Sequence, residues 1–270
     1  MRSSWLGGAR HLAQRARAWQ LLQLPRRLVA FIAAVVTADL AAIVLAAHWT
    51  VVSPRDLVIF GLLVACGGVT VEMTRRTGES AMFVKDVCGV WELPIAILLP
   101  PIFALIAPIP RIAMTQWRVR KIAPHRRVFS AAAISLSYGS VYLAFHEFER
   151  ITTLSLTGSG REAAEWIVAV AACALLQWVV NNSLVITAVK GSDPTASLRQ
   201  LLFGKDNVHN DVIEGCVATL VTLGAAISPV AILFALPFVN LRVRAVETAC
   251  SASGEDGTLA FTGSSRGRSK

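Results

Sequence analysis

Residues 28–47 read LVAFIAAVVTADLAAIVLAA, and Asp39 is the single charged side chain among them. A helix needs about 20 mostly apolar residues to cross the hydrocarbon core of a bilayer, and this stretch meets that requirement. Across the whole chain 54% of the residues are hydrophobic and 16% are charged, whereas about 25% are charged in an average soluble domain. The sequence therefore predicts an integral membrane protein and excludes a soluble globular enzyme or a disordered chain.

Further apolar runs follow this first span along the chain. They occupy residues 57–71, 93–114, 128–146, 166–189 and 212–239. We therefore predict an all-α fold, a polytopic transmembrane helix bundle with about five to six apolar segments over residues 28–247. The Gly/Ser-rich tail 248–270 is predicted to be disordered. In the basic segment 1–27, Trp5, Leu12 and Trp19 share one helical face, which favours an interfacial helix; the alternative is an unstructured basic tail.

Basic residues gather in two clusters that flank apolar runs. Residues 1–27 contain Arg2, Arg10, Arg15, Arg17, Arg26 and Arg27, and the second cluster contains Arg111, Arg118, Arg120, Lys121, Arg126 and Arg127. Because cytoplasmic loops are enriched in Lys and Arg, both clusters and the N-terminus are predicted to be cytoplasmic. The acidic stretch 147–165 is then predicted to lie outside. Beside membrane spans such clusters indicate contact with anionic lipid headgroups rather than with nucleic acid.

The number of crossings poses a problem, since three apolar runs begin between the two basic clusters. An odd number of crossings cannot return the chain to the same side, so one of these runs does not cross. One candidate is the short run 57–71; the other is the Pro-rich run 93–114, folded as a re-entrant hairpin that turns at Pro100-Pro101. The last run has the same ambiguity: it crosses once, or it forms a hairpin at Ser228-Pro229.

Five residues inside the apolar runs are candidates for ligand binding or signal sensing. Asp39 is costly in a bilayer and should face the bundle interior, as a ligand-binding or proton-sensing group or as an acid hydrogen-bonded to a polar neighbour. Asn181 and Asn182 interrupt another span, either as interhelical hydrogen-bonding groups or as ligand contacts. Pro100 and Pro101 mark the predicted break in the helix.

Residue patterns of known enzymes are missing from the sequence. It contains no GxSxG, HExxH, GxxxxGK[ST] or GxGxxG motif, and its five cysteines show no metal-ligand or disulfide spacing. We therefore expect a protein that is not an enzyme and that uses no cofactor and no metal.

Three stretches, in this order, resemble a known family. They are VEMTRRTGE (71–79); LPIAILLPP (93–101) leading to TQWRVRK (115–121) and HRRVFSAAAISLSYG (125–139); and VVNNSLV (179–185) followed by SLRQLL (197–202). Together they are similar to the N-terminal membrane region of actinobacterial signalling proteins with a cytoplasmic GGDEF domain, and more distantly to that of HD-GYP proteins. The resemblance covers roughly residues 28–247. The chain departs from the family after LRVRAVE (241–247), because no GGDEF sequence follows.

This resemblance implies a sensory or anchoring module of cyclic di-GMP signalling in the bacterial inner membrane. It carries over no cyclase residues. The expected partners are membrane lipid and a cytoplasmic signalling protein or a second copy of the chain. The alternative is a small-molecule transporter or transporter subunit, which the interrupted segments and the intramembrane polar residues would also fit.

Overall fold

The computed structural model describes residues 24–76, 81–118, 123–152, 156–197, 205–235 and 237. These residues form α-helices joined by short turns, and no β-strand occurs among them. The predicted all-α class is confirmed. The interfacial helix predicted in residues 1–27 lies almost wholly outside the described residues, and the tail 248–270 lies entirely outside them.

The helices follow one another in the order α2 (Arg26–Trp49), α3 (Pro54–Arg76), α4 (Ala81–Leu98), α5 (Pro101–Ile106), α6 (Pro108–Arg118), α7 (Pro124–Thr152), α8 (Gly160–Ser192) and α10 (Lys205–Ile227). The start of α3 is fixed by a capping box. There Ser53 and Asp56 exchange bonds between side chain and backbone N–H, at 3.0 and 3.2 Å. The Ser159 hydroxyl caps α8 in the same way, by accepting from the Glu162 N–H.

Four segments of the described chain are long and apolar enough to cross a membrane: α2, residues Pro54–Met73 of α3, α7 and α8. Few residues of the most apolar parts of α2 and α8 are buried inside the protein. Their outward faces expose large apolar side chains such as Val44 and Val168, which are 70% and 67% exposed. Extended apolar surface of this kind fits contact with lipid chains. The chain is therefore a helical membrane protein.

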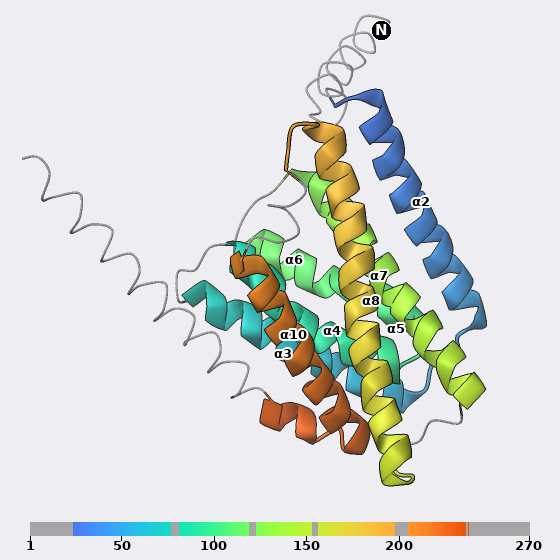
Figure 1. Cartoon of the computed structure of the whole chain (residues 1–270). Coiled ribbons are helices and arrows are strands. Elements are labelled where there is room, and N and C mark those ends of the chain that lie inside the picture. The colour runs from blue at the N-terminus through green and yellow to red at the C-terminus, as the bar shows by residue number, and fades with distance from the viewer. Residues whose placement is uncertain are drawn as a thin grey trace, which may run out of the picture.

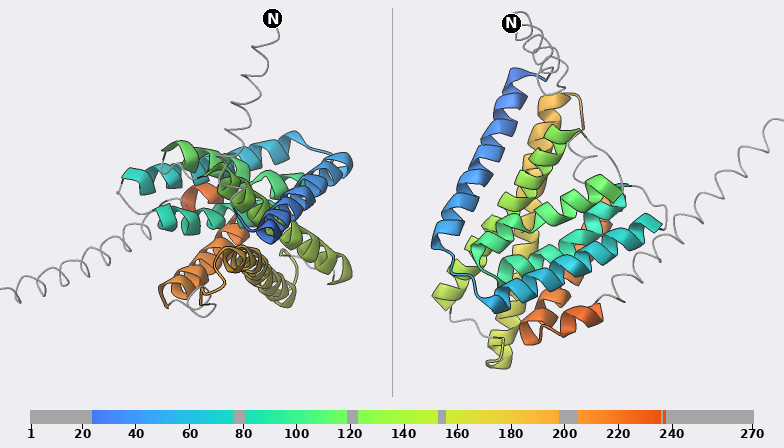
Figure 2. Two further views of the ribbon diagram at one scale, coloured as in Figure 1. Left: turned by 90° about the horizontal axis from the view of Figure 1, so that it is seen from above. Right: turned by 180° about the vertical axis from the view of Figure 1, so that it is seen from behind.

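The three long helices α2, α7 and α8 run side by side along the molecule, while α3, α4 and α6 run across them (Figures 1 and 2). The rings of Phe31 and Phe129 lie 6.0 Å apart, which brings the starts of α2 and α7 together. The end of α8 joins them, because Gly191 packs against Leu28. The basic residues at the starts of α2 and α7 thus share one end of the bundle. The side of the membrane on which this end lies remains a prediction.

The Pro-rich run 93–114 folds back on itself. Helix α4 ends at Leu98, α5 forms the turn, and α6 runs back against α3 and α7, where Arg111 meets Glu92 of α4 at 2.9 Å. Residues 57–71 belong instead to the continuous 23-residue helix α3. Of the two alternatives that the sequence left open, the structure has the hairpin geometry expected of a re-entrant segment.

The last apolar run bends near Ser228-Pro229, the position of the hairpin that was one of the two alternatives for this run. Helix α10 ends at Ile227, the chain turns at Pro229-Val230, and residues 231–235 are helical again. Ile232 packs back onto Val221 and Ala225, in a cluster that also holds Trp91. The residues after 237 lie outside the described part of the chain, and the side of the membrane that they reach stays a prediction.

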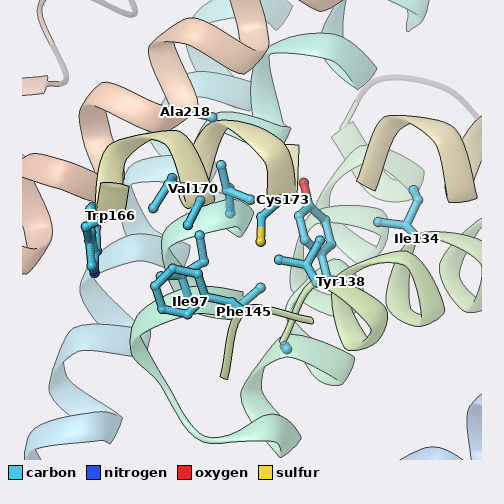
Figure 3. Close-up of a cluster of buried hydrophobic side chains, with 13 residues drawn as sticks. Ile97, Ile134, Tyr138, Phe145, Trp166, Val170, Cys173 and Ala218 are labelled. Carbon is cyan, nitrogen blue, oxygen red and sulfur yellow. The ribbon is translucent and has the colours of Figure 1, made fainter. Parts of the chain in front are cut away.

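The centre of the bundle is α4, which contacts α3, α5, α7 and α10. Nearly every side chain of its second half is buried, including Trp91, Ile95 and Ala96. A helix that is apolar on all sides belongs in the interior of a protein. Figure 3 shows a second cluster, in which Ile97 of α4 lies among Phe145 of α7 and Trp166 and Val170 of α8. The tight packing around α4 holds the polar groups described next in fixed positions.

Candidate functional site

A polar cavity of about 100 Å³ lies where α4, α6, α7, α8 and α10 meet. A dry cavity of about 150 Å³ accommodates benzene, so this space suits a smaller molecule or a few waters. Eight polar or charged residues line it, namely Glu92, Arg111, Tyr138, Gln177, Asn181, Asn182, Asp211 and Glu214. Because such side chains are rare inside membrane bundles and mark binding or transport sites there, the cavity is the candidate functional site.

The central pair of the cavity joins the two arms of the hairpin. Glu92 of α4 is 4% exposed, and its Oε1 lies 2.9 Å from Nε of Arg111 on α6. The hydroxyl of Tyr138 on α7 lies close to the same carboxylate. Neither Glu92 oxygen accepts a hydrogen bond of regular geometry from the described residues. Arg111 thus balances the charge of the carboxylate, and Tyr138 lies beside it.

Helix α8 contributes a face of amide side chains. Gln177 and Asn181 are four residues apart, so they lie on one side of the helix. Asn182 donates to its own helix, from Nδ2 to the Trp178 carbonyl at 2.9 Å. The Asn181 Oδ1 is buried and accepts no hydrogen bond among the described residues. Both asparagines line the cavity, and neither makes a described hydrogen bond to another helix.

Helix α10 closes the cavity with two carboxylates. Asp211 Oδ2 accepts a hydrogen bond of 2.6 Å from the Trp178 indole N–H, which ties α10 to α8. Glu214 lies against Gly89 of α4, and a Cβ added at Gly89 would collide with Glu214 Oε1. An alanine at residue 89 would therefore have to push aside the carboxylate end of the Glu214 side chain. This contact couples residue 89 of α4 to an acid of α10 that lines the cavity.

Asp39 lies away from this cavity, in a separate buried contact between α2 and α7. The Ser135 hydroxyl oxygen lies 2.5 Å from Asp39 Oδ1 and 2.7 Å from the Leu105 carbonyl oxygen. One hydroxyl proton cannot be given to both acceptors. The arrangement is satisfied when Ser135 donates to Leu105 and a protonated Asp39 donates to Ser135. A neutral acid also avoids the cost of a charge inside the bundle.

We expect Asp39→Asn to insert normally and to keep its free energy of unfolding within about 1 kcal/mol of wild type, because the amide N–H can donate to Ser135 as the acid does. Ser135→Ala should cost about 1–3 kcal/mol, since it leaves the buried Asp39 without its partner. Both values are measured by SDS titration in mixed micelles. An Asp39→Asn protein less stable than Ser135→Ala would contradict the protonated form of Asp39.

Pro100 and Pro101 shape the hairpin and do not line the cavity. The Pro100 carbonyl accepts the Phe103 N–H at 3.0 Å, and Pro101 occupies the first turn of α5, where its missing N–H costs nothing. The structure thus brings Asn181 and Asn182 together at the cavity and leaves Asp39, Pro100 and Pro101 elsewhere. The two prolines end α4 and let α6 return to it.

The central residues of the cavity were not among the sequence candidates. Arg111 was assigned to a cytoplasmic basic cluster, but its side chain is only 11% exposed and pairs with Glu92. Glu214 lies near the start of the last apolar run, where polar residues are common, so its position in the sequence does not mark it. The signal that could have found this pair is the single acid Glu92 directly before an apolar run, with a single base at the far end of that run.

Comparison with known proteins adds no family to this description. No family model matches the chain, and neither a curated protein nor a solved structure matches it. The fold and the cavity define the chain as a multi-helix membrane protein with a buried polar site.

Proposed function

We propose that the chain is the membrane sensing module of a bacterial signalling system and not an enzyme. The observation that carries this proposal is the polar cavity that α4, α8 and α10 line. A sensor needs a site for its signal and an element whose position depends on that site. The cavity supplies the site, and α10 is the element.

Helix α10 is the route by which cavity occupancy would be communicated. Its first turns carry Asp211 and Glu214 in the cavity, and its later residues Val221 and Ala225 pack in the core around Trp91. Beyond α10 the chain bends at Pro229 and leads to its C-terminal segment. A ligand that binds one arrangement of α4 and α10 better than another shifts the populations of the two. The signal then reaches a cytoplasmic partner or a second copy of the chain.

The resemblance to membrane regions of GGDEF proteins suggests cyclic di-GMP signalling as the output. We therefore test the proposal with Gly89→Ala, which displaces Glu214 without adding a charge. The full chain is returned to a strain that lacks the gene and carries a cyclic di-GMP-responsive reporter. We expect reporter output to change by about 5-fold or more, the lower end of allosteric coupling between two sites.

The matched control is Gly61→Ala in α3, where an added Cβ meets nothing within 4 Å. This variant should leave the reporter at its wild-type level. Equal output from wild type, Gly89→Ala and Gly61→Ala, at equal amounts of protein in the membrane, would overturn the proposal.

A transporter is the second candidate, because α4 and α6 form a broken hairpin that lines the cavity. Interrupted helices near the substrate are typical of secondary transporters. Uptake of a cavity ligand into proteoliposomes would favour this function over sensing.

A further inference from the structure

We infer that the end of the bundle at which α2 and α7 begin binds a phospholipid headgroup with two phosphates. We call this end the arginine end and define it by Arg26 and Arg27 of α2 and Arg126 of α7. Arg127 is engaged elsewhere, since its Nε donates to Gln116 Oε1 of α6 at 2.8 Å. The inference goes beyond the proposed function, because it holds for a sensor and for a transporter alike.

Helix packing brings the arginines of α2 and α7 together. The rings of Phe31 and Phe129 lie 6.0 Å apart. Arg27 precedes Phe31 by four residues and Arg126 precedes Phe129 by three. Each arginine therefore lies about one turn before these rings, on the same side of its helix. Residues that are far apart in the sequence thus form one surface where the two helices begin.

The arginine end lies at the depth of lipid headgroups. Arg26 and Arg27 directly precede the apolar run 28–47, and Arg126 lies just before the run 128–146. Both runs belong to helices that are long and apolar enough to cross a membrane. The ends of such helices lie at the boundary between hydrocarbon and headgroups, where basic side chains reach lipid phosphates.

The positive charge of this surface is not balanced within the described part of the chain. Neither α2 nor α7 has an acidic residue in its first turn. Arg26, Arg27 and Arg126 are exposed, and none of them forms an ion pair with a described residue. Asp193, at the adjacent end of α8, accepts instead from the N–H and the hydroxyl of Thr195, at 3.0 and 2.6 Å. An anion between α2 and α7 would lower the repulsion among the arginines.

The opposite end of the bundle is different. Arg150, near the end of α7, pairs with Glu147 at 2.5 Å, and Arg161, at the start of α8, pairs with Glu165 at 2.8 Å. Arg55 of α3 is exposed and has no arginine of another helix beside it among these residues. Within the described residues, unpaired exposed arginines of two helices therefore meet only at the arginine end.

The distribution of the arginines over two helices favours two phosphates over one. A guanidinium group binds phosphate through two parallel N–H···O bonds. A headgroup with two phosphates can place one against α2 and the other against α7, while its acyl chains stay in the lipid beside the helices. Basic sites between membrane helices bind headgroups of this kind.

The test compares two anionic lipids at equal total charge. The full chain is placed in phosphatidylcholine nanodiscs that contain a rising fraction of cardiolipin, with two phosphates, or twice that fraction of phosphatidylglycerol, with one. Its Tm is followed by intrinsic Trp fluorescence. We expect a saturable rise in Tm that reaches half its maximum at a lower total lipid charge with cardiolipin. Sodium pyrophosphate, which supplies two phosphates without a lipid, should leave Tm unchanged in pure phosphatidylcholine.

Variants locate the effect at the arginine end. Arg26→Gln/Arg27→Gln and Arg126→Gln should raise the cardiolipin fraction at half-maximal effect by about fivefold for each arginine removed. The matched control is Arg55→Gln, which removes an exposed arginine at the opposite end of the bundle. Its response should equal that of wild type. Tm in pure phosphatidylcholine shows that each variant is folded.

The possible outcomes decide between this site and a general effect of charge. An absent rise in Tm, equal half-maximal charges for the two lipids, or a response weakened as much by Arg55→Gln would each overturn the inference. A rise with pyrophosphate as large as that with cardiolipin would overturn the assignment to a lipid. The reporter test of Gly89→Ala addresses the sensing function separately, so failure of one proposal leaves the other standing.

Discussion

Arg111→Met is expected to lower the free energy of unfolding by about 3–5 kcal/mol, the cost of removing one partner of a buried ion pair. The substitution leaves Glu92, which is 4% exposed, as a buried carboxylate whose described ion-pair partner is gone. The same pair joins the two arms of the hairpin, so its loss also weakens the contact between α4 and α6. SDS titration of the purified protein in mixed micelles measures the effect.

A double variant tests whether Arg111→Met loses stability because Glu92 keeps an uncompensated charge or because packing is lost. Replacing a buried ion pair with apolar residues of similar volume is often neutral or stabilising. We therefore expect Glu92→Leu/Arg111→Met to recover most of the stability that Arg111→Met loses. Arg161→Met serves as the matched control, because Arg161 forms an exposed pair with Glu165, and exposed pairs contribute little. A double variant as unstable as Arg111→Met would refute the explanation by uncompensated charge.

The fold class could be predicted from the sequence because the bilayer imposes it. Only helices and closed barrels satisfy their backbone groups in lipid, and runs such as 28–47 have the length and composition of spanning helices. The number of membrane crossings could not be predicted from length and composition alone. The choice between 57–71 and 93–114 depends on how α6 folds back after α5 and packs against α3 and α7, and no local pattern encodes this packing.

The cavity could be predicted only in part, for a related reason. Asn181 and Asn182 stand out because they are polar residues within an apolar run. Glu92 and Arg111 each lie at the edge of such a run, where charges are common, and they meet only after the run between them folds back. Asp39 is the opposite case, because it does not line the cavity. It stands out in the sequence, yet its neighbour Ser135 satisfies it in a contact that needs no ligand.

Trp91→Ala is the second substitution with a large expected effect, because Trp91 joins α4 to α3. Its side chain is 1% exposed, and its indole N–H donates to Thr70 Oγ1 at 3.0 Å. The Thr70 hydroxyl in turn donates to the Cys66 carbonyl at 3.0 Å. The ring also packs over Gly67, where a Cβ would lie 3.7 Å from Trp91 Cδ1. Truncation to alanine removes the hydrogen bond and leaves a cavity that its neighbours can only partly fill.

Trp→Ala in a packed core costs about 3–5 kcal/mol, and we expect the lower end, about 3 kcal/mol. The reason is that lipid offers apolar contacts to the side chain when the helices separate, so less is lost by transfer than in water. Trp91→Phe keeps most of the ring and should cost about 1 kcal/mol, the net value of the hydrogen bond to Thr70. Trp117→Ala on α6 is the control, since that side chain is 85% exposed. Equal losses for Trp91→Ala and Trp117→Ala in SDS titration would show that α4 is not held to α3 by this residue.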